Sequence, residues 1–160
     1  MDGAAKLARQ YFLELSPPQP HRIHFIARKG SYHGNTLGAL SISGHKARRS
    51  IYEPMLASNV SHVSACNEYR GREQGETIPV YVKRLADELD EEFQRVGPGK
   101  VCAFVAEPVV GAVSERLHAV SPNYADHGPS VGAWMRPIRA RLLESNEDGM
   151  RQAWCTTHPG

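Results

Sequence analysis

Residues 27–44 read ARKGSYHGNTLGALSISG, and this stretch decides the fold that the rest of the sequence predicts. The apolar run 23–27 leading into it is typical of a β-strand, and the polar residues 29–34 indicate a tight turn between two glycines. Asn35 or Thr36 then caps a helix of small and apolar residues. A strand, a glycine-flanked turn and a capped helix together predict a ligand site at the carboxyl edge of an α/β sheet.

The turn presents two side chains suited to ligand binding. Gly30 and Gly34 permit backbone angles closed to other residues, so we expect Tyr32 and His33 to project from the turn. An aromatic ring presented in this way suits stacking on a planar ligand. The alternative is a surface loop in which Tyr32 covers a small apolar cluster, because short glycine-flanked motifs also occur by chance.

Two further segments are predicted to be helical. Residues 3–15 and 77–96 carry apolar side chains at helical spacing, and proline or glycine follows each segment. The stripe of the second helix consists of Val82, Leu85, Ala86, Leu89, Phe93 and Val96. Its acidic residues, including Glu88, lie mostly off that stripe, so we interpret them as a solvated face.

Between these helices the sequence is less regular. Residues 45–50 indicate a basic turn, and 51–62 an irregular crossing with Tyr52 and Met55 packed inward. Residues 60–64 alternate as a strand does. His62 and Cys66 have zinc-ligand spacing, but no second ligand pair follows, so a structural role is favoured for both.

The continuous apolar run 101–106 predicts a strand buried on both faces of a parallel sheet. Glu107 follows it directly, and a carboxylate at that place points towards the ligand edge. The alternative is a glutamate satisfied by loop amides.

Composition narrows the class of protein. With 160 residues, 41% hydrophobic and 22% charged, the chain suits one globular domain. A net charge of +2 favours neither nucleic acid nor membrane, and no apolar run approaches the roughly 20 residues of a membrane span. The three cysteines share no CxxC spacing, and Cys102 suits a reduced, buried thiol. Without a signal-peptide pattern, we expect a cytoplasmic or mitochondrial-matrix location.

Two motifs carry a family resemblance. Residues 30–36 (GSYHGNT) with 38–41 and Gly44 resemble the SYHG segment of the class III (ornithine/omega-type) aminotransferases, and 103–112 (AFVAEPVVGA) is similar to their EPxxG segment. The resemblance covers residues 4–112. It implies a three-layer α/β/α fragment of the large domain of fold-type-I transferases that depend on pyridoxal phosphate.

The resemblance also implies roles for individual residues. Tyr32 stacks on the pyridoxal phosphate ring, His33 and Gly34 shape the turn, and Glu107 stands near the ring and the substrate. The implied reaction moves an amino group from a small-molecule amino donor to a keto acid or aldehyde, and full-length members are dimers.

Other family features have no counterpart. The turn that holds the cofactor phosphate, the aspartate that pairs with the ring nitrogen and the Schiff-base lysine are absent, and residues 113–160 contain no lysine. We expect 1–112 to be a partial large domain with exposed sheet edges, inactive alone, and 113–160 to be a divergent, poorly ordered tail. The alternative is a non-catalytic remnant that pairs with an intact aminotransferase chain. Nucleic-acid binding through the arginines of the tail is weak, because acidic residues match them.

Overall fold

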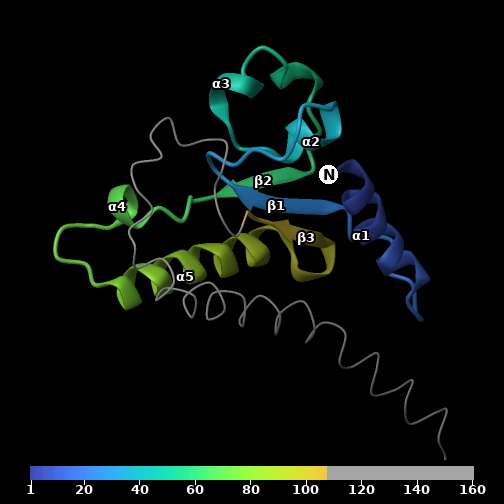
Figure 1. Ribbon diagram of the computed structural model, residues 1–160. Helices are drawn as coiled ribbons and strands as arrows, with labels where there is room; N and C mark the ends of the chain where they lie inside the picture. Colours follow the sequence, from blue (N-terminus) through green and yellow to red (C-terminus); the bar gives the residue numbers. More distant parts are fainter. Residues whose placement is uncertain (108–160) are drawn as a thin grey trace, which may run out of the picture.

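The computed structural model describes residues 1–107, which form a parallel sheet with helices on both faces (Figure 1). The strand order is β2-β1-β3, with β1 (His24–Arg28) between β2 (Val60–Val63) and β3 (Val101–Val105). β1 is parallel to both neighbours. The predicted α/β fold is confirmed, and the carboxyl ends of all three strands lie at one edge.

Helix α5 (Ile78–Val96) covers one face of this sheet. Its buried side chains recur every four residues and pack against strand residues; the cluster comprises Ile26, Val63, Tyr81, Leu85, Leu89, Phe93 and Val101. Each such aliphatic or phenyl side chain contributes roughly 1.5–3 kcal/mol through its removal from water. Gly97, with φ at 102°, ends the helix.

The opposite face is covered by the short helix α2 (Leu37–Ile42), and α3 (Lys46–Arg49) packs against α2. Of the two predicted caps, Thr36 is the one used: its Oγ1 accepts a hydrogen bond from the Ala39 N–H at 3.3 Å. Ala39, Leu40 and Ile42 are buried, so this small-residue helix lies close to the sheet.

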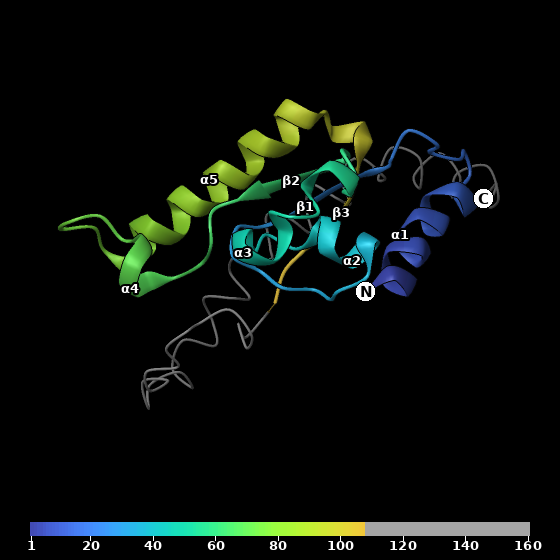
Figure 2. The ribbon, with the colours of Figure 1, turned by 90° about the horizontal axis from the view of Figure 1, so that it is seen from above.

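Helix α1 (Asp2–Glu14) lies beside β3, with Phe12 buried. The loop that carries α4 (Glu68–Gly71) lies at the other end of the molecule (Figure 2). Two short 3-10 helices, η1 (Glu53–Met55) and η2 (Pro98–Lys100), complete the secondary structure of this part of the chain.

The packing differs from the sequence-based interpretation at three places. Tyr52 and Met55 are 43% and 63% exposed rather than packed inward, since the segment that carries them turns away from the sheet as η1. Tyr81 is buried although it was not part of the predicted stripe, and its hydroxyl accepts from the Asn67 N–H at 3.0 Å. Glu88 is half-buried, because Ser64 donates to its carboxylate through both N–H and Oγ at 3.0 and 2.9 Å.

The outer strands of the sheet each have one neighbour within residues 1–107, as expected for a fragment. No helix in this part of the chain has the length and apolar character needed to cross a membrane. The predicted boundary at Ala112 and the predicted tail 113–160 lie outside the residues that the structure describes.

Candidate functional site

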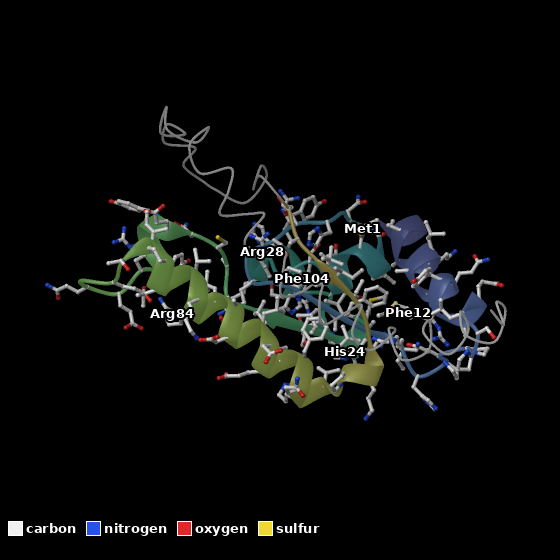
Figure 3. All side chains as sticks on the ribbon, turned by 90° about the horizontal axis from the view of Figure 1, so that it is seen from below. Met1, Phe12, His24, Arg28, Arg84 and Phe104 are labelled. Carbon is white, nitrogen blue, oxygen red and sulfur yellow. The ribbon has the colours of Figure 1, made fainter. Side chains whose placement is uncertain are left out.

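The candidate site is built on the turn of residues 29–34, at the carboxyl end of β1. Figure 3 labels Arg28 at this end of the strand and His24 at the other. Two hydrogen bonds of 3.0 Å join the turn to Gly44, which lies two residues beyond α2: Gly30 N–H donates to Gly44 O, and Gly44 N–H donates to Ser31 O. A Cβ at Gly44 would lie 2.2 Å from Arg28 O, so only glycine allows this close approach.

Tyr32 and Glu107 are joined directly, although 75 positions separate them in sequence. The Tyr32 N–H donates to Glu107 Oε1 at 2.9 Å, and the Arg28 guanidinium donates to Glu107 O at 3.0 Å. The amide contact that was the alternative role for Glu107 is therefore present. The same contact brings the two sequence motifs into one site.

His33 is held by its backbone and leaves part of its ring unsatisfied. Its N–H donates to Ser43 Oγ at 2.8 Å, and that hydroxyl donates to Ala39 O at 2.8 Å. Within residues 1–107, the buried His33 Nε2 has no hydrogen-bond partner. Burial lowers the pKa of His33, and the nearby Glu107 carboxylate opposes that shift. The ring is therefore predominantly neutral at pH 7, with a nitrogen suited to a further polar atom.

Gly34 has a φ of 136°, a conformation that favours glycine. A Cβ at this position would also lie 2.9 Å from the Cβ of Ala39. The turn can therefore close on α2 only with glycine at position 34.

The Tyr32 ring is half-buried and lies under a cation. The guanidinium carbon of Arg48, on α3, is 4.4 Å from the centre of the ring. This cation–π contact between the turn and α3 was not predicted from the sequence, in which residues 45–50 indicated only a basic turn.

Ser43 and Arg49 also support the site without having been predicted. Ser43 is fully buried, and Arg49 Nη1 donates to the carbonyls of Leu40, Ser41 and Ser43 at the end of α2. The carbonyls of a last helical turn need such donors. A sequence signal did exist in retrospect: a serine after the last apolar helix position, followed by arginines, suits a carbonyl-rich helix end.

The other predicted candidates have structural or surface roles. His62 Nε2 donates to the carbonyls of Ile42 and Ser43 at 3.0 and 3.1 Å. Cys102 is a free, buried thiol as predicted, and Cys66 is a free, exposed one. Among residues 1–107, no three side chains of metal-ligating type gather as a metal site would require.

Comparison with known proteins identifies the family. The model of the class-III aminotransferase family matches residues 1–124, and thus most of the chain. The chain belongs to the class-III aminotransferases. The resemblance inferred from the two motifs is therefore confirmed.

Several curated proteins match the chain over part of their length. An aminotransferase of Gibberella zeae is 61% identical over 113 residues, which are 70% of this chain and 22% of that protein. An uncharacterized aminotransferase of Schizosaccharomyces pombe is 55% identical over 112 residues, 70% and 24% of the two chains. A mitochondrial gamma-aminobutyrate transaminase of Oryza sativa is 38% identical over 69% of this chain and 21% of its own. The chain thus spans about a quarter or less of these relatives.

Solved structures of transaminases share the fold. A PLP-bound aminotransferase mutant from Vibrio fluvialis matches with a TM-score of 0.66 and 28% identity, over 85% of this chain and 28% of that one. A PMP-bound form from the same organism matches with a TM-score of 0.65 and 29% identity, over the same shares. The aminotransferases similar to this chain thus include forms bound to pyridoxal phosphate and to its amine form, pyridoxamine phosphate.

Proposed function

We propose that residues 1–107 form part of the cofactor-binding site of an aminotransferase that depends on pyridoxal phosphate. The observation that carries this proposal is the 2.9 Å hydrogen bond from the Tyr32 N–H to Glu107 Oε1. It joins the two segments that resemble the family's ring-stacking and ring-edge motifs. The bound cofactor supplies an electron sink for moving an amino group between an amino donor and a keto acid or aldehyde.

The residues of the turn fit the ring end of that cofactor. The Tyr32 ring offers a face for stacking, and the buried His33 Nε2 has no hydrogen-bond partner in residues 1–107 and suits a polar ligand atom. Glu107 holds the turn in position by accepting a hydrogen bond from the Tyr32 N–H. Its carboxylate also places negative charge beside His33. Gly34 lets the turn close on α2.

The phosphate end of the cofactor is not provided by α1. Asp2 stands in the first turn of this helix, and its Oδ2 accepts from Thr36 Oγ1 at 2.5 Å. That hydrogen bond lowers the pKa of Asp2, so the carboxylate carries a negative charge that disfavours phosphate.

Lys29, the first residue of the turn, acts as a surface residue. Its side chain is 63% exposed, and its Nζ lies 3.9 Å from Glu88 Oε1. An exposed side chain beside a carboxylate does not favour Lys29 as the nucleophile. On this proposal, the chain by itself binds the cofactor but does not catalyse transamination.

The test is a titration of the purified 160-residue chain with pyridoxal phosphate, followed by visible absorbance before and after borohydride. We expect saturable binding without a reducible band that maps to one lysine. Tyr32→Ala should weaken binding about two- to tenfold, since an aromatic pair contributes 0.5–1.5 kcal/mol. Tyr69→Ala, at a residue that is 93% exposed, is the matched control and should leave binding unchanged. Equal affinity of the wild type and Tyr32→Ala would contradict the proposal.

A second candidate function is an interaction partner of an intact aminotransferase chain. It is favoured by the outer strands, each of which has one neighbour in residues 1–107, and by exposed apolar side chains such as Leu7 and Ile51. Size-exclusion chromatography of the chain mixed with a full-length class-III enzyme tests it. Co-elution of the two proteins supports this partner role. Separate elution, with both proteins far above their cellular concentrations, contradicts it.

The location that accompanies both functions is the cytoplasm or the mitochondrial matrix. The rice relative is named as mitochondrial, which supports the mitochondrion as one of these two compartments. Fractionation of cells that express the chain with a C-terminal tag distinguishes the two compartments, and recovery with secreted protein would contradict both.

A further inference from the structure

Two adjacent arginines of the basic segment 45–50 have different environments in the structure. Arg49 is 14% exposed at its side chain; it binds carbonyls at the end of α2 and pairs with Glu53 at 3.1 Å. Arg48 is exposed and lies over the Tyr32 ring at 4.4 Å. Arg49 thus completes the fold, whereas Arg48 lies against the residue assigned to ligand stacking.

The position of Arg48 has a consequence for any ligand that stacks on Tyr32. Tyr32 is half-buried, and the guanidinium of the exposed Arg48 lies over one face of its ring. A planar ligand that stacks on the face under Arg48 must therefore displace the guanidinium. A cation–π contact at such an exposed site contributes enough to reduce the affinity of that ligand about two- to fivefold.

The charge of Arg48 is also available to a ligand. Within residues 1–107, no carboxylate forms an ion pair with Arg48, in contrast to Arg49. Because its backbone is fixed on α3, a displaced Arg48 side chain stays close to the edge of the ring. An anionic ligand recovers, by pairing with this cation, part of the free energy that displacement costs, whereas a neutral ligand recovers none.

We propose that Arg48 is a specificity-determining residue that shields the Tyr32 ring and favours planar ligands carrying an anionic group over neutral ones. This inference rests on the proposed function, because it assumes that Tyr32 is the stacking residue. It concerns a side chain that neither of the family-like motifs contains.

The first experiment measures ligand selectivity with pyridoxine and pyridoxine 5′-phosphate, which are alcohols and cannot form a Schiff base with surface lysines. Equilibrium dialysis against the full chain gives both affinities. In Arg48→Ala we expect neutral pyridoxine to bind about two- to fivefold more tightly, and the phosphate to change less than about twofold. Arg48→Lys should retain the selectivity for the phosphate, because it keeps the charge while it loses the planar stack.

Lys46→Ala is the matched control, since it removes an exposed positive charge from the same short helix. It should leave the ratio of the two affinities unchanged. An equal fall in that ratio for Lys46→Ala and Arg48→Ala would show a general effect of charge and would overturn the role of Arg48. So would unchanged or weaker binding of pyridoxine by Arg48→Ala.

A second experiment needs no ligand. Tetranitromethane nitrates accessible tyrosines, and peptide mapping gives the modification of Tyr32 relative to Tyr69, which is 93% exposed. Arg48→Ala should raise this ratio about twofold or more if the guanidinium shields the ring. An unchanged ratio overturns the shielding.

The two experiments separate failure of the inference from failure of the proposed function. If wild type and Tyr32→Ala bind both ligands equally, stacking on Tyr32 is wrong, and with it the proposed function and the selectivity. If Arg48→Ala still raised the nitration of Tyr32 relative to Tyr69, only the shielding of the Tyr32 ring by Arg48 would be supported. If Tyr32→Ala weakens binding and Arg48→Ala does not change selectivity, the proposed function stands and the inference about Arg48 falls.

Discussion

The two faces of the sheet differ in the contacts that hold their helices. On the face covered by α5, Leu85, Leu89 and Phe93 are buried in an apolar cluster. On the face covered by α2, Ala39, Leu40 and Ile42 are also buried, but His62 of β2 adds hydrogen bonds to the carbonyls of Ile42 and Ser43. The hydrophobic effect does not depend on the relative orientation of the buried groups, whereas a hydrogen bond restricts the distance and angle between its donor and acceptor. The α5 face therefore provides most of the stability, and the α2 face positions the candidate site.

The largest expected effect is on the apolar face. Leu85→Ala removes a side chain that is 2% exposed and should lower the free energy of unfolding by about 2–5 kcal/mol. Urea denaturation followed by circular dichroism measures it. Val80→Ala, on the same helix at a residue that is 56% exposed, should cost no more than about 0.5 kcal/mol. Similar losses for both variants would contradict the packing of α5.

A smaller loss of stability, combined with loss of the site, is expected on the other face. Gly44→Ala places a Cβ 2.2 Å from Arg28 O, and the turn must shift, which should cost about 1–3 kcal/mol. Because the shift displaces Tyr32, the loss in binding free energy for pyridoxal phosphate should exceed the loss in the free energy of unfolding. At Gly99 a Cβ meets nothing within 4 Å, so Gly99→Ala is the control and should change neither measurement. A Gly44→Ala chain with wild-type binding would show that the turn does not need this approach.

Ser43→Ala tests the polar contacts of the α2 face by removing one oxygen atom, Ser43 Oγ. It removes the acceptor of the His33 N–H and should destabilise the fold by about 1–2 kcal/mol. Hydrogen exchange of the His33 amide, measured by NMR, should accelerate in this variant. The exposed Ser58 provides the control, and Ser58→Ala should leave this exchange unchanged. If the His33 amide exchanges at the wild-type rate in Ser43→Ala, the contact is not formed in solution.

The smallest expected effect is a dependence of stability on pH that comes from the α2 face. Burial lowers the pKa of His62 below its usual value, with the nearby Arg49 acting in the same direction and two carbonyl contacts opposing it. The unfolded chain therefore binds a proton more readily than the folded one. The resulting stability is present above the unfolded pKa, near 6.5, and declines as the pH falls below it.

Denaturation by urea at pH 7.5 and 5.5 tests this assignment. His62→Gln should reduce the loss of stability between these values, and the matched control His21→Gln, at an exposed position, should not. Equal loss in wild type and His62→Gln would assign the pH dependence to other groups, among which His33 and His24 also have lowered pKa values through burial.

The parts of the fold that could be predicted are those with a regular pattern. The periodic apolar residues gave α5, and the apolar runs gave β1 and β3, each within about one residue of its observed bounds. Tyr52 and Met55 were assigned wrongly because an irregular segment has no period from which to infer direction. Tyr81 was missed because a buried hydroxyl needs a partner, and Asn67 supplies one only in three dimensions.

The candidate site shows the same division. Tyr32, His33, Gly34 and Glu107 belong to local motifs, and the structure places them around one turn. The contacts of Ser43, Arg48 and Arg49 join segments that are irregular in sequence, and no local pattern specifies which backbone carbonyl or ring each side chain reaches. Their roles depend on the packing of α2 against the sheet.

The link between Tyr32 and Glu107 also determines when the site forms during synthesis. The ribosome adds about 5–20 residues per second, so the Tyr32 turn emerges roughly 4–15 seconds before a carboxylate 75 positions later. Because β1 has no hairpin partner and pairs only with later strands, it also waits for them. The emerging chain therefore exposes an apolar strand and an incomplete turn for seconds, and exposed apolar segments of this kind are prone to aggregate without chaperones.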